Sequence, residues 1–160
     1  MKTEDNRSVI VLTDNNENQM LRVILCKPGE KVEIVEIDDT LEAMQELVGG
    51  YIQEYMPFTG DDPRYDDVAI ICNEEGKLMR LPPSRAITNE YGQVMDVIAG
   101  PFFICYAPLE SERFLSMPED LEEEFRKRYE LPEQFFRTEI GIKAVKYDPG
   151  KEPAEQDQAR

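Results

Sequence analysis

Apolar residues in this chain gather in short runs that turn-forming residues separate. Uninterrupted or alternating apolar runs of strand length lie at residues 21–27, 32–37, 68–72, 94–98 and 102–106. Runs of this length that end in Gly, Pro, Asn or Asp are typical of β-strands. Pro28 and Gly29 separate the first two runs, so the pattern predicts a β-hairpin there.

The clearest helical pattern covers residues 39–52. Asp39 is a suitable N-cap and Glu42 follows three residues later, which completes a capping box. Apolar residues at helical spacing are Leu41, Met44, Leu47, Val48 and Ile52. Gly49 and Gly50 interrupt the pattern and either end the helix or let it continue tightly against a sheet. Close packing explains these glycines better than phosphate binding does, because no strand–glycine–helix order precedes them.

The middle of the chain is rich in Gly and Pro. Residues 56–67 predict a loop, residues 75–76 a tight turn, and residues 77–81 a strand that pairs with 68–72. Pro82 and Pro83 should end that strand, and residues 84–87 should form a single helical turn. A further turn at residues 89–92 precedes the last two apolar runs.

A second helix is expected over residues 118–130, with Ser116 as its cap and Pro118 in its first turn. Three Glu residues each stand four positions before a basic residue, which predicts the ion pairs Glu122–Arg126, Glu123–Lys127 and Glu124–Arg128. Each such pair contributes about 0.2–0.5 kcal/mol when exposed. Residues 140–145 predict a final strand.

These elements predict one α+β domain of 160 residues. A mixed or mostly antiparallel sheet of about five to six strands should pack with two main helices. Residues 1–20 form an N-terminal extension with a strand at 9–12, residues 21–117 the core, and residues 118–147 the second helix and last strand. Residues 148–160 lack an apolar pattern and predict a disordered tail.

The net charge of −16 is large for this length. A surface this negative repels nucleic-acid phosphates, so direct DNA or RNA binding is not expected. The charge instead favours solubility and basic partners. No apolar run approaches the about 20 residues that cross a bilayer, and the polar start does not resemble a signal peptide. The expected location is therefore the cytoplasm of the host cell, with no membrane partner.

The residue types present exclude several chemistries. The chain has no histidine and three cysteines with no Cys-x-x-Cys spacing. Zinc sites of Cys and His and nucleophile–histidine units are therefore excluded, and no cofactor is expected. The aspartates of the 56–67 loop, Asp61, Asp62, Asp66 and Asp67, could hold a hard cation, although solvated turns commonly have this composition. Paired carboxylates remain available for hydrolysis, so enzymatic activity stays open but unsupported.

Several polar residues follow strand ends and form a candidate ligand site. They are Asn73, Glu74, Arg85, Asp96 and Gly100. An amide, two carboxylates and a guanidinium from neighbouring strand ends could converge on a small polar ligand, and Arg85 suits a planar anion. The structural alternative is that Asn73 shapes its turn while Arg85 pairs with Glu74 or Asp96.

Three phrases carry a resemblance to a known family. They are the helical segment 40–52, the phrase Asn-Glu-Glu-Gly-Lys-Leu at 73–78, and the phrase Asp-Val-Ile-Ala-Gly-Pro-Phe-Phe at 96–103. In this order they resemble the domain-of-unknown-function family 3846, over about residues 21–117. The Pro-x-x-Arg phrase has Ser84 where members often have Asn. The resemblance implies a small bacterial protein of the kind found on phages and mobile elements, without a settled activity.

Together these observations favour a non-catalytic binding protein of a mobile element that sequesters a small polar or anionic ligand or a host protein. One alternative is an acidic inhibitor that imitates nucleic acid and occupies the groove of a host DNA- or RNA-binding protein. A third is a carboxylate-based enzyme, with Mg²⁺ held by the aspartate loop.

Overall fold

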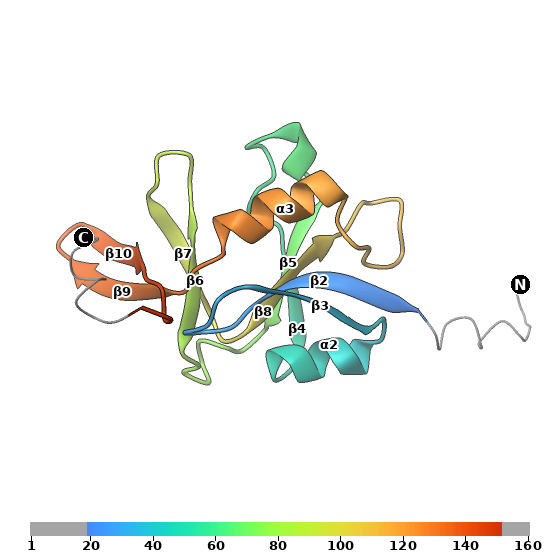
Figure 1. Ribbon diagram of the computed structural model, residues 1–160, viewed down its shortest axis with the longest axis horizontal. Coiled ribbons are helices and arrows are strands. Elements are labelled where there is room, and N and C mark those ends of the chain that lie inside the picture. Colours follow the sequence, from blue (N-terminus) through green and yellow to red (C-terminus); the bar gives the residue numbers. More distant parts are fainter. Residues whose placement is uncertain (1–18, 152–160) are drawn as a thin grey trace, which may run out of the picture.

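The computed structural model describes residues 19–151 (Figure 1). The strand predicted at 9–12 and most of the predicted tail lie outside these residues. A five-stranded sheet forms the centre of the molecule, and every pair of neighbouring strands in it is antiparallel. Its order is β3 (Glu33–Asp38), β2 (Met20–Cys26), β8 (Phe102–Tyr106), β5 (Val68–Asn73) and β4 (Ile52–Tyr55). The predicted α+β class with a mostly antiparallel sheet and two helices is confirmed.

The sheet is buried on both faces, which explains its uninterrupted apolar runs. Helix α2 (Leu41–Val48) lies below the sheet in Figure 1 and helix α3 (Glu119–Arg128) above it. Successive residues of a strand point to opposite faces, so each central strand contributes to two cores. In β5, for example, Ala69 and Ile71 pack with the α2 side, whereas Val68 and Ile70 pack with the α3 side.

Helix α2 begins one residue later than predicted. Thr40 is the N-cap, and its hydroxyl accepts a hydrogen bond from Ala43 N at 3.1 Å. Asp39 instead pairs with Arg113, which leaves the capping role to its neighbour. Gly49 ends the helix in the left-handed conformation, with a φ of 81°. Strand β4 then starts at Ile52, so the continuation of the helix into residues 51–52 is wrong.

The segment after β5 differs from the prediction. Residues 74–80 form consecutive turns rather than a returning strand. Strand β6 (Pro83–Thr88) replaces the predicted helical turn and pairs with β7 (Val94–Ala99). Pro83 starts this strand, which is one of the places where a sheet tolerates proline. The sequence predicted that the chain after β5 returns to pair with β5. In the structure the next strand is β6, and it pairs with β7, which follows the turn at 89–92.

Helix α3 is confirmed, but its cap and most of its ion pairs differ. Pro118 occupies the N-cap position, and Ser116 accepts a hydrogen bond from Arg22 N at 3.0 Å. Glu122 pairs with Arg22 of β2, and Glu124 pairs with Arg64. Of the three predicted ion pairs the structure forms Glu123–Lys127, at 3.7 Å. Partners from other elements compete successfully for the remaining carboxylates.

A second hairpin follows α3. Strands β9 (Glu133–Thr138) and β10 (Gly141–Lys146) pair with each other, and β10 matches the predicted final strand. The hairpin lies beside β6 and β7 at the left of Figure 1. Glu133 connects the β9–β10 hairpin to the β6–β7 pair, because its Oε1 accepts a hydrogen bond from Ala86 N at 2.9 Å. Within residues 19–151, neither helix has the length and apolar character needed to traverse a bilayer.

Candidate functional site

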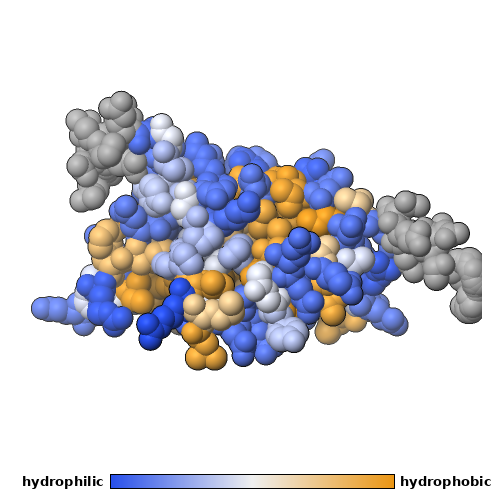
Figure 2. Space-filling view, turned by 90° about the horizontal axis from the view of Figure 1, so that it is seen from below, coloured by the Kyte–Doolittle hydropathy of each residue, from blue (hydrophilic) through white to orange (hydrophobic). Residues whose placement is uncertain are grey.

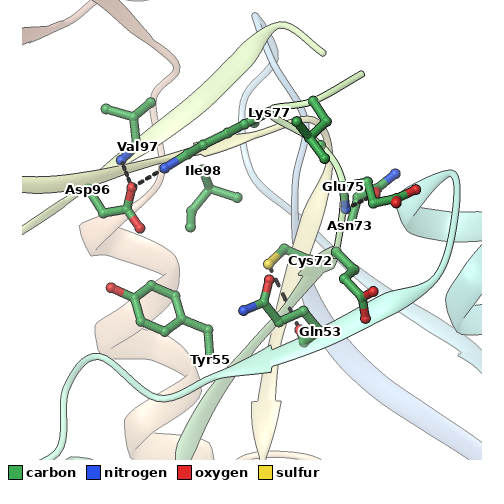
Figure 3. Close-up of a pocket in the computed structure, with 13 residues that line it drawn as sticks. Gln53, Tyr55, Cys72, Asn73, Glu75, Lys77, Asp96, Val97 and Ile98 are labelled. Carbon is green, nitrogen blue, oxygen red and sulfur yellow. Dashed lines mark hydrogen bonds and ion pairs between the residues drawn. The ribbon is translucent and has the colours of Figure 1, made fainter. Parts of the chain in front are cut away.

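A pocket of about 280 Å³ lies where β4, β5, the turn after β5 and β7 meet (Figure 3). Its walls combine apolar, amide, phenolic, thiol and charged side chains. Its lining consists of Gln53, Tyr55, Cys72, Asn73, Glu74, Glu75, Gly76, Lys77, Leu78, Asp96, Val97, Ile98 and Ala99. A concave site with a few convergent polar groups on an apolar base is typical of small-ligand pockets.

The first wall of the pocket consists of residues from β4 and β5, and the register between these strands sets their positions. Gln53 stands opposite Cys72, and Tyr55 opposite Ile70, in the antiparallel pair of β4 and β5. Directly opposite residues share a face of the sheet, so Gln53, Tyr55 and Cys72 all point to the α3 side. The side chain of Asn73, one residue further along β5, points to the α2 side.

The second wall is the turn at residues 74–81. Backbone hydrogen bonds close it from Met79 N to Glu75 O at 2.9 Å and from Leu81 N to Gly76 O at 3.0 Å. Gly76 lies directly against β7: a Cβ atom at this position would stand 2.7 Å from Ala99 O. A side chain there would push the turn away from β7, so the glycine sets the width of the pocket.

An ion pair links this turn to β7. Lys77 Nζ lies 2.6 Å from Asp96 Oδ1, and the same oxygen accepts a hydrogen bond from Val97 N at 2.8 Å. The Lys77 side chain is 68 % exposed and that of Asp96 is 31 % exposed. Figure 3 shows the pair above Tyr55 and Gln53. The backbone amide of Val97 therefore holds Asp96 in place, whereas the Lys77 side chain is mostly exposed to solvent.

Both titratable groups at the base of the pocket stay neutral at physiological pH. Burial is the main cause that raises the pKa of the Cys72 thiol, and the negative charge of Asp96 adds to the effect. The same two causes, in the same order, raise the pKa of the Tyr55 phenol. The thiolate is the nucleophilic form of cysteine, so Cys72 is not prepared for nucleophilic attack.

Three polar groups around the pocket have no hydrogen-bonding side chain or backbone group to satisfy them within residues 19–151. They are the side-chain amide of Gln53, the hydroxyl of Tyr55 and the second carboxylate oxygen of Asp96, Oδ2. Polar groups that protein partners leave free remain available to water or to a ligand. They could together accept hydrogen bonds from a donor placed in the pocket.

The structure brings part of the predicted ligand site together. Glu74 and Asp96 both line the pocket. Asn73 borders it, but its amide donates to Val48 O at 3.2 Å and its Oδ1 accepts from Glu75 N at 2.8 Å. These contacts fasten the end of α2 and start the turn, as the structural alternative for Asn73 proposed. Buried Gly100 stands just beyond the pocket, where its N donates to Pro82 O.

Arg85 lies apart from these residues. Its side chain is completely buried, and it donates hydrogen bonds to the backbone oxygens of Tyr129, Lys27, Ser84 and Glu30. Neither Glu74 nor Asp96 is among its partners. Tyr129 is the C-cap of α3, where carbonyl groups carry partial negative charge. Arg85 thus joins β6 to the end of α3 and to the β2–β3 turn, and its guanidinium is unavailable for an anion in the pocket.

The aspartate loop serves local structure. Asp62 caps the short 3₁₀ helix η1 (Pro63–Tyr65), accepts from Arg64 N at 2.9 Å and pairs with the Arg64 side chain. Those contacts lower the pKa of the Asp62 carboxyl. Asp66 accepts from Gly60 N. Among the described residues, no group of three or more acidic or cysteine side chains is arranged to hold a metal ion.

Sequence reasoning missed Gln53, Tyr55, Cys72 and Lys77 as lining residues. Residues 51–52 were interpreted as the end of a helix, so the strand that presents Gln53 and Tyr55 was not expected. The helix-breaking pair Gly49-Gly50 was the available signal. Lys77 belonged to the phrase at 73–78, but the strand predicted over 77–81 gave its side chain no particular direction.

Fold and pocket together define a small α+β protein with a two-sided antiparallel sheet and a polar pocket at one edge. A family model, the domain of unknown function DUF3846, matches residues 21–130. The chain belongs to this family, and the match extends past the 21–117 resemblance through α3. No curated protein and no solved structure matches the chain. Hairpin β9–β10 lies beyond the matched residues.

Proposed function

We propose that this protein is a non-catalytic binding protein whose pocket between β4, β5 and β7 takes a small polar ligand. The observation that carries the proposal is the convergence of Gln53, Tyr55 and Asp96, each with polar atoms that residues 19–151 leave unsatisfied, on one pocket. A pocket of about 280 Å³ lies near the lower end of the range for small-ligand pockets, about 300–1,000 Å³. A compact metabolite fits this space, in keeping with a sequestering protein of a phage or mobile element that acts in the host cytoplasm.

The chemistry of the lining favours binding over turnover. The chain has no histidine to act as a general base, and the raised pKa of Cys72 keeps its thiol protonated. Asp96 accepts hydrogen bonds from Lys77 and from the backbone amide of Val97, which hold it as a fixed acceptor. A fixed, partnered acceptor suits recognition of a ligand.

A second candidate function is the imitation of nucleic acid toward a basic host protein. The segment 33–55, which includes β3, α2 and β4, contains seven acidic residues and neither Lys nor Arg. Figure 2 views the molecule from the α2 side, where hydrophilic side chains surround apolar patches. The acidic segment favours this function, whereas the apolar patches are unlike a phosphate backbone.

The ligand proposal is tested by equilibrium dialysis of the full chain against a small-molecule extract of host cells, followed by mass spectrometry of the retained compounds. Variant Gln53→Phe fills the pocket, and Gln134→Phe makes the same exchange on exposed strand β9. The wild type and Gln134→Phe should retain a compound that Gln53→Phe loses.

Retention by all three proteins alike, or by none, would contradict the proposal. In the second case the acidic segment becomes the better explanation, and association with basic proteins should weaken steeply with salt. Conversion of a dialysed compound into a product that Gln53→Phe does not form would instead indicate an enzyme.

A further inference from the structure

We infer that the pocket selects a small organic cation, an amine or a guanidinium, with Asp96 as its counter-ion and Lys77 as an internal competitor. This inference rests on the proposed function and specifies its ligand. It departs from the anion that the sequence favoured, because Arg85 is the residue on which that expectation depended.

The charge of the lining is the first observation. Three carboxylates, from Glu74, Glu75 and Asp96, line the pocket together with a single ammonium, that of Lys77. A concave surface with this balance attracts cations and repels anions. The whole chain reinforces the effect, since its net charge is −16.

The carboxylate of Asp96 is already arranged as a receptor for an ammonium. Val97 N and Lys77 Nζ both approach Oδ1, at 2.8 and 2.6 Å, which fixes the orientation of the group. Oδ2 has no hydrogen-bond partner within residues 19–151, and the side chain is 69 % covered. A donor that enters the pocket meets this oxygen, while Lys77 at Oδ1 competes with it for the charge of the carboxylate.

The ammonium of Lys77 shows that a cation can pair with Asp96 at this position, and a ligand can displace it. The Lys77 side chain extends from the turn and is 68 % exposed. Ion pairs this exposed are worth only about 0–1 kcal/mol, because water competes and a long side chain must be ordered. A ligand cation that also contacts the pocket walls would therefore replace Lys77 at low cost.

The remaining walls suit the rest of such a molecule. Cys72 and Ile98 are buried apolar surfaces at the base, against which methylene groups can pack. The neutral phenol of Tyr55 offers a hydroxyl acceptor and an aromatic ring, and cations are attracted to aromatic faces. The side-chain oxygen of Gln53 is a further acceptor for an N–H donor.

Three probes of equal size test the charge preference: n-butylammonium, butyrate and n-butanol. Each is titrated into ¹⁵N-labelled full chain while the backbone amide signals of Tyr55, Gly76 and Val97 are followed. Butylammonium should shift these signals at concentrations about tenfold lower than the other two, the factor expected for about 1.4 kcal/mol of screened attraction.

Three variants assign the effect to the ion pair. Asp96→Asn should abolish the preference for butylammonium, and Lys77→Met should strengthen its binding about threefold to tenfold by removing the competitor. Glu90→Gln, at an exposed turn outside the pocket, is the matched loss of charge and should change nothing. A fourth probe, lysine with its amino and carboxyl groups blocked, distinguishes two sources of the cation. If it binds more tightly than butylammonium, the natural ligand is the side chain of a protein partner. If it binds more weakly, the natural ligand is a free amine.

Equal binding of butyrate and butylammonium, or an unchanged preference in Asp96→Asn, would overturn the inference and leave the proposed function intact. Absence of any probe-induced shift, together with a retained compound in the dialysis experiment, would do the same. Failure of both experiments would remove the proposed function itself.

Discussion

At the scale of single residues, Arg85 shows how a polar side chain can belong to the core. Its guanidinium is surrounded by backbone carbonyl groups rather than by a carboxylate, and these come from two other segments, the β2–β3 turn and the end of α3. Hydrogen bonds to a charged donor are among the stronger ones in proteins. Arg85 is thus the point at which β6, the β2–β3 turn and the end of α3 are held together.

Replacement of Arg85 by methionine should therefore destabilise the fold strongly. The apolar part of the side chain is kept, but the carbonyls of Glu30 and Tyr129 lose their donor, while Lys27 O retains Glu30 N as a donor. Unsatisfied buried groups cost about 1–3 kcal/mol each, so for two such carbonyls we expect a loss of about 2–6 kcal/mol in the free energy of unfolding. Urea denaturation measures it, with Arg137→Met on an exposed part of β9 as the matched control. Equal stability of the two variants would contradict this role.

At the scale of elements, the β9–β10 hairpin depends on the core through Glu133. The carboxylate accepts from Ala86 N of β6 at 2.9 Å and lies 3.8 Å from Lys146 Nζ, while its side chain is only 6 % exposed. A further backbone bond, from Val32 N to Glu130 O, fixes the segment just before the hairpin. A hydrogen bond from Lys146 Nζ to Arg128 O at 2.8 Å completes these polar attachments, which lie outside the central sheet, so the hairpin can open without unfolding that sheet.

Variant Glu133→Ala should release this hairpin. Ala86 N loses its acceptor, at a cost of about 1–3 kcal/mol, and amide hydrogen exchange in β9 and β10 should become about tenfold faster or more. Mass spectrometry of peptic fragments reports this exchange, and fragments from β5 and β8 should be unaffected. Glu139→Ala, at the exposed tip of the hairpin, is the control. Uniform acceleration across the chain would mean that Glu133 stabilises the whole fold instead.

At the scale of the whole molecule, the two cores contain three buried thiols and a buried phenol. Burial raises the pKa of Cys26 to about 12, and it also raises the pKa values of Cys105 and Tyr129. In the unfolded chain Cys26 ionises near its ordinary value of 9.0. Above that pH the folded state holds more protons than the unfolded state, so stability falls as pH rises.

We therefore expect an alkaline loss of stability between about pH 9 and 12. Cys26 alone would contribute up to about 4 kcal/mol over this window, at about 1.4 kcal/mol per pKa unit. Urea denaturation at a series of pH values measures the slope, and Cys26→Ala should make it shallower although the variant is less stable at pH 7. An identical slope in this variant would show that Cys26 does not cause the loss.

Much of the architecture was predictable because it rests on local patterns. The apolar runs of β2, β5 and β8 and the apolar spacing in α2 each express the burial of one element, whereas α3 was predicted from the spacing of its charges. Errors fell where two conformations fit the local pattern. Residues 84–87 could form a helical turn in isolation, and pairing with β7 made them a strand.

The candidate site likewise contains residues that the sequence predicted and residues that only the tertiary structure placed there. Glu74 and Asp96 were named from sequence, since polar residues at strand ends commonly line pockets, and both do so here. Tyr55 and Gln53 were missed because they enter the pocket only through the register of β4 against β5. Arg85 was separated from the pocket by contacts with carbonyl groups that lie 44 to 58 residues away along the chain.

The sequence by itself determined which segments are buried, the α+β class, the absence of histidine chemistry and the strongly negative charge. These properties follow from residue types and short-range periodicity, which do not depend on contacts with distant segments of the chain. Only the tertiary structure decided which polar side chains meet. The closeness of Gly76 to Ala99 O, the pairing of Lys77 with Asp96 and the burial of Arg85 join segments distant in sequence, and such contacts arise when the strands pack in one register.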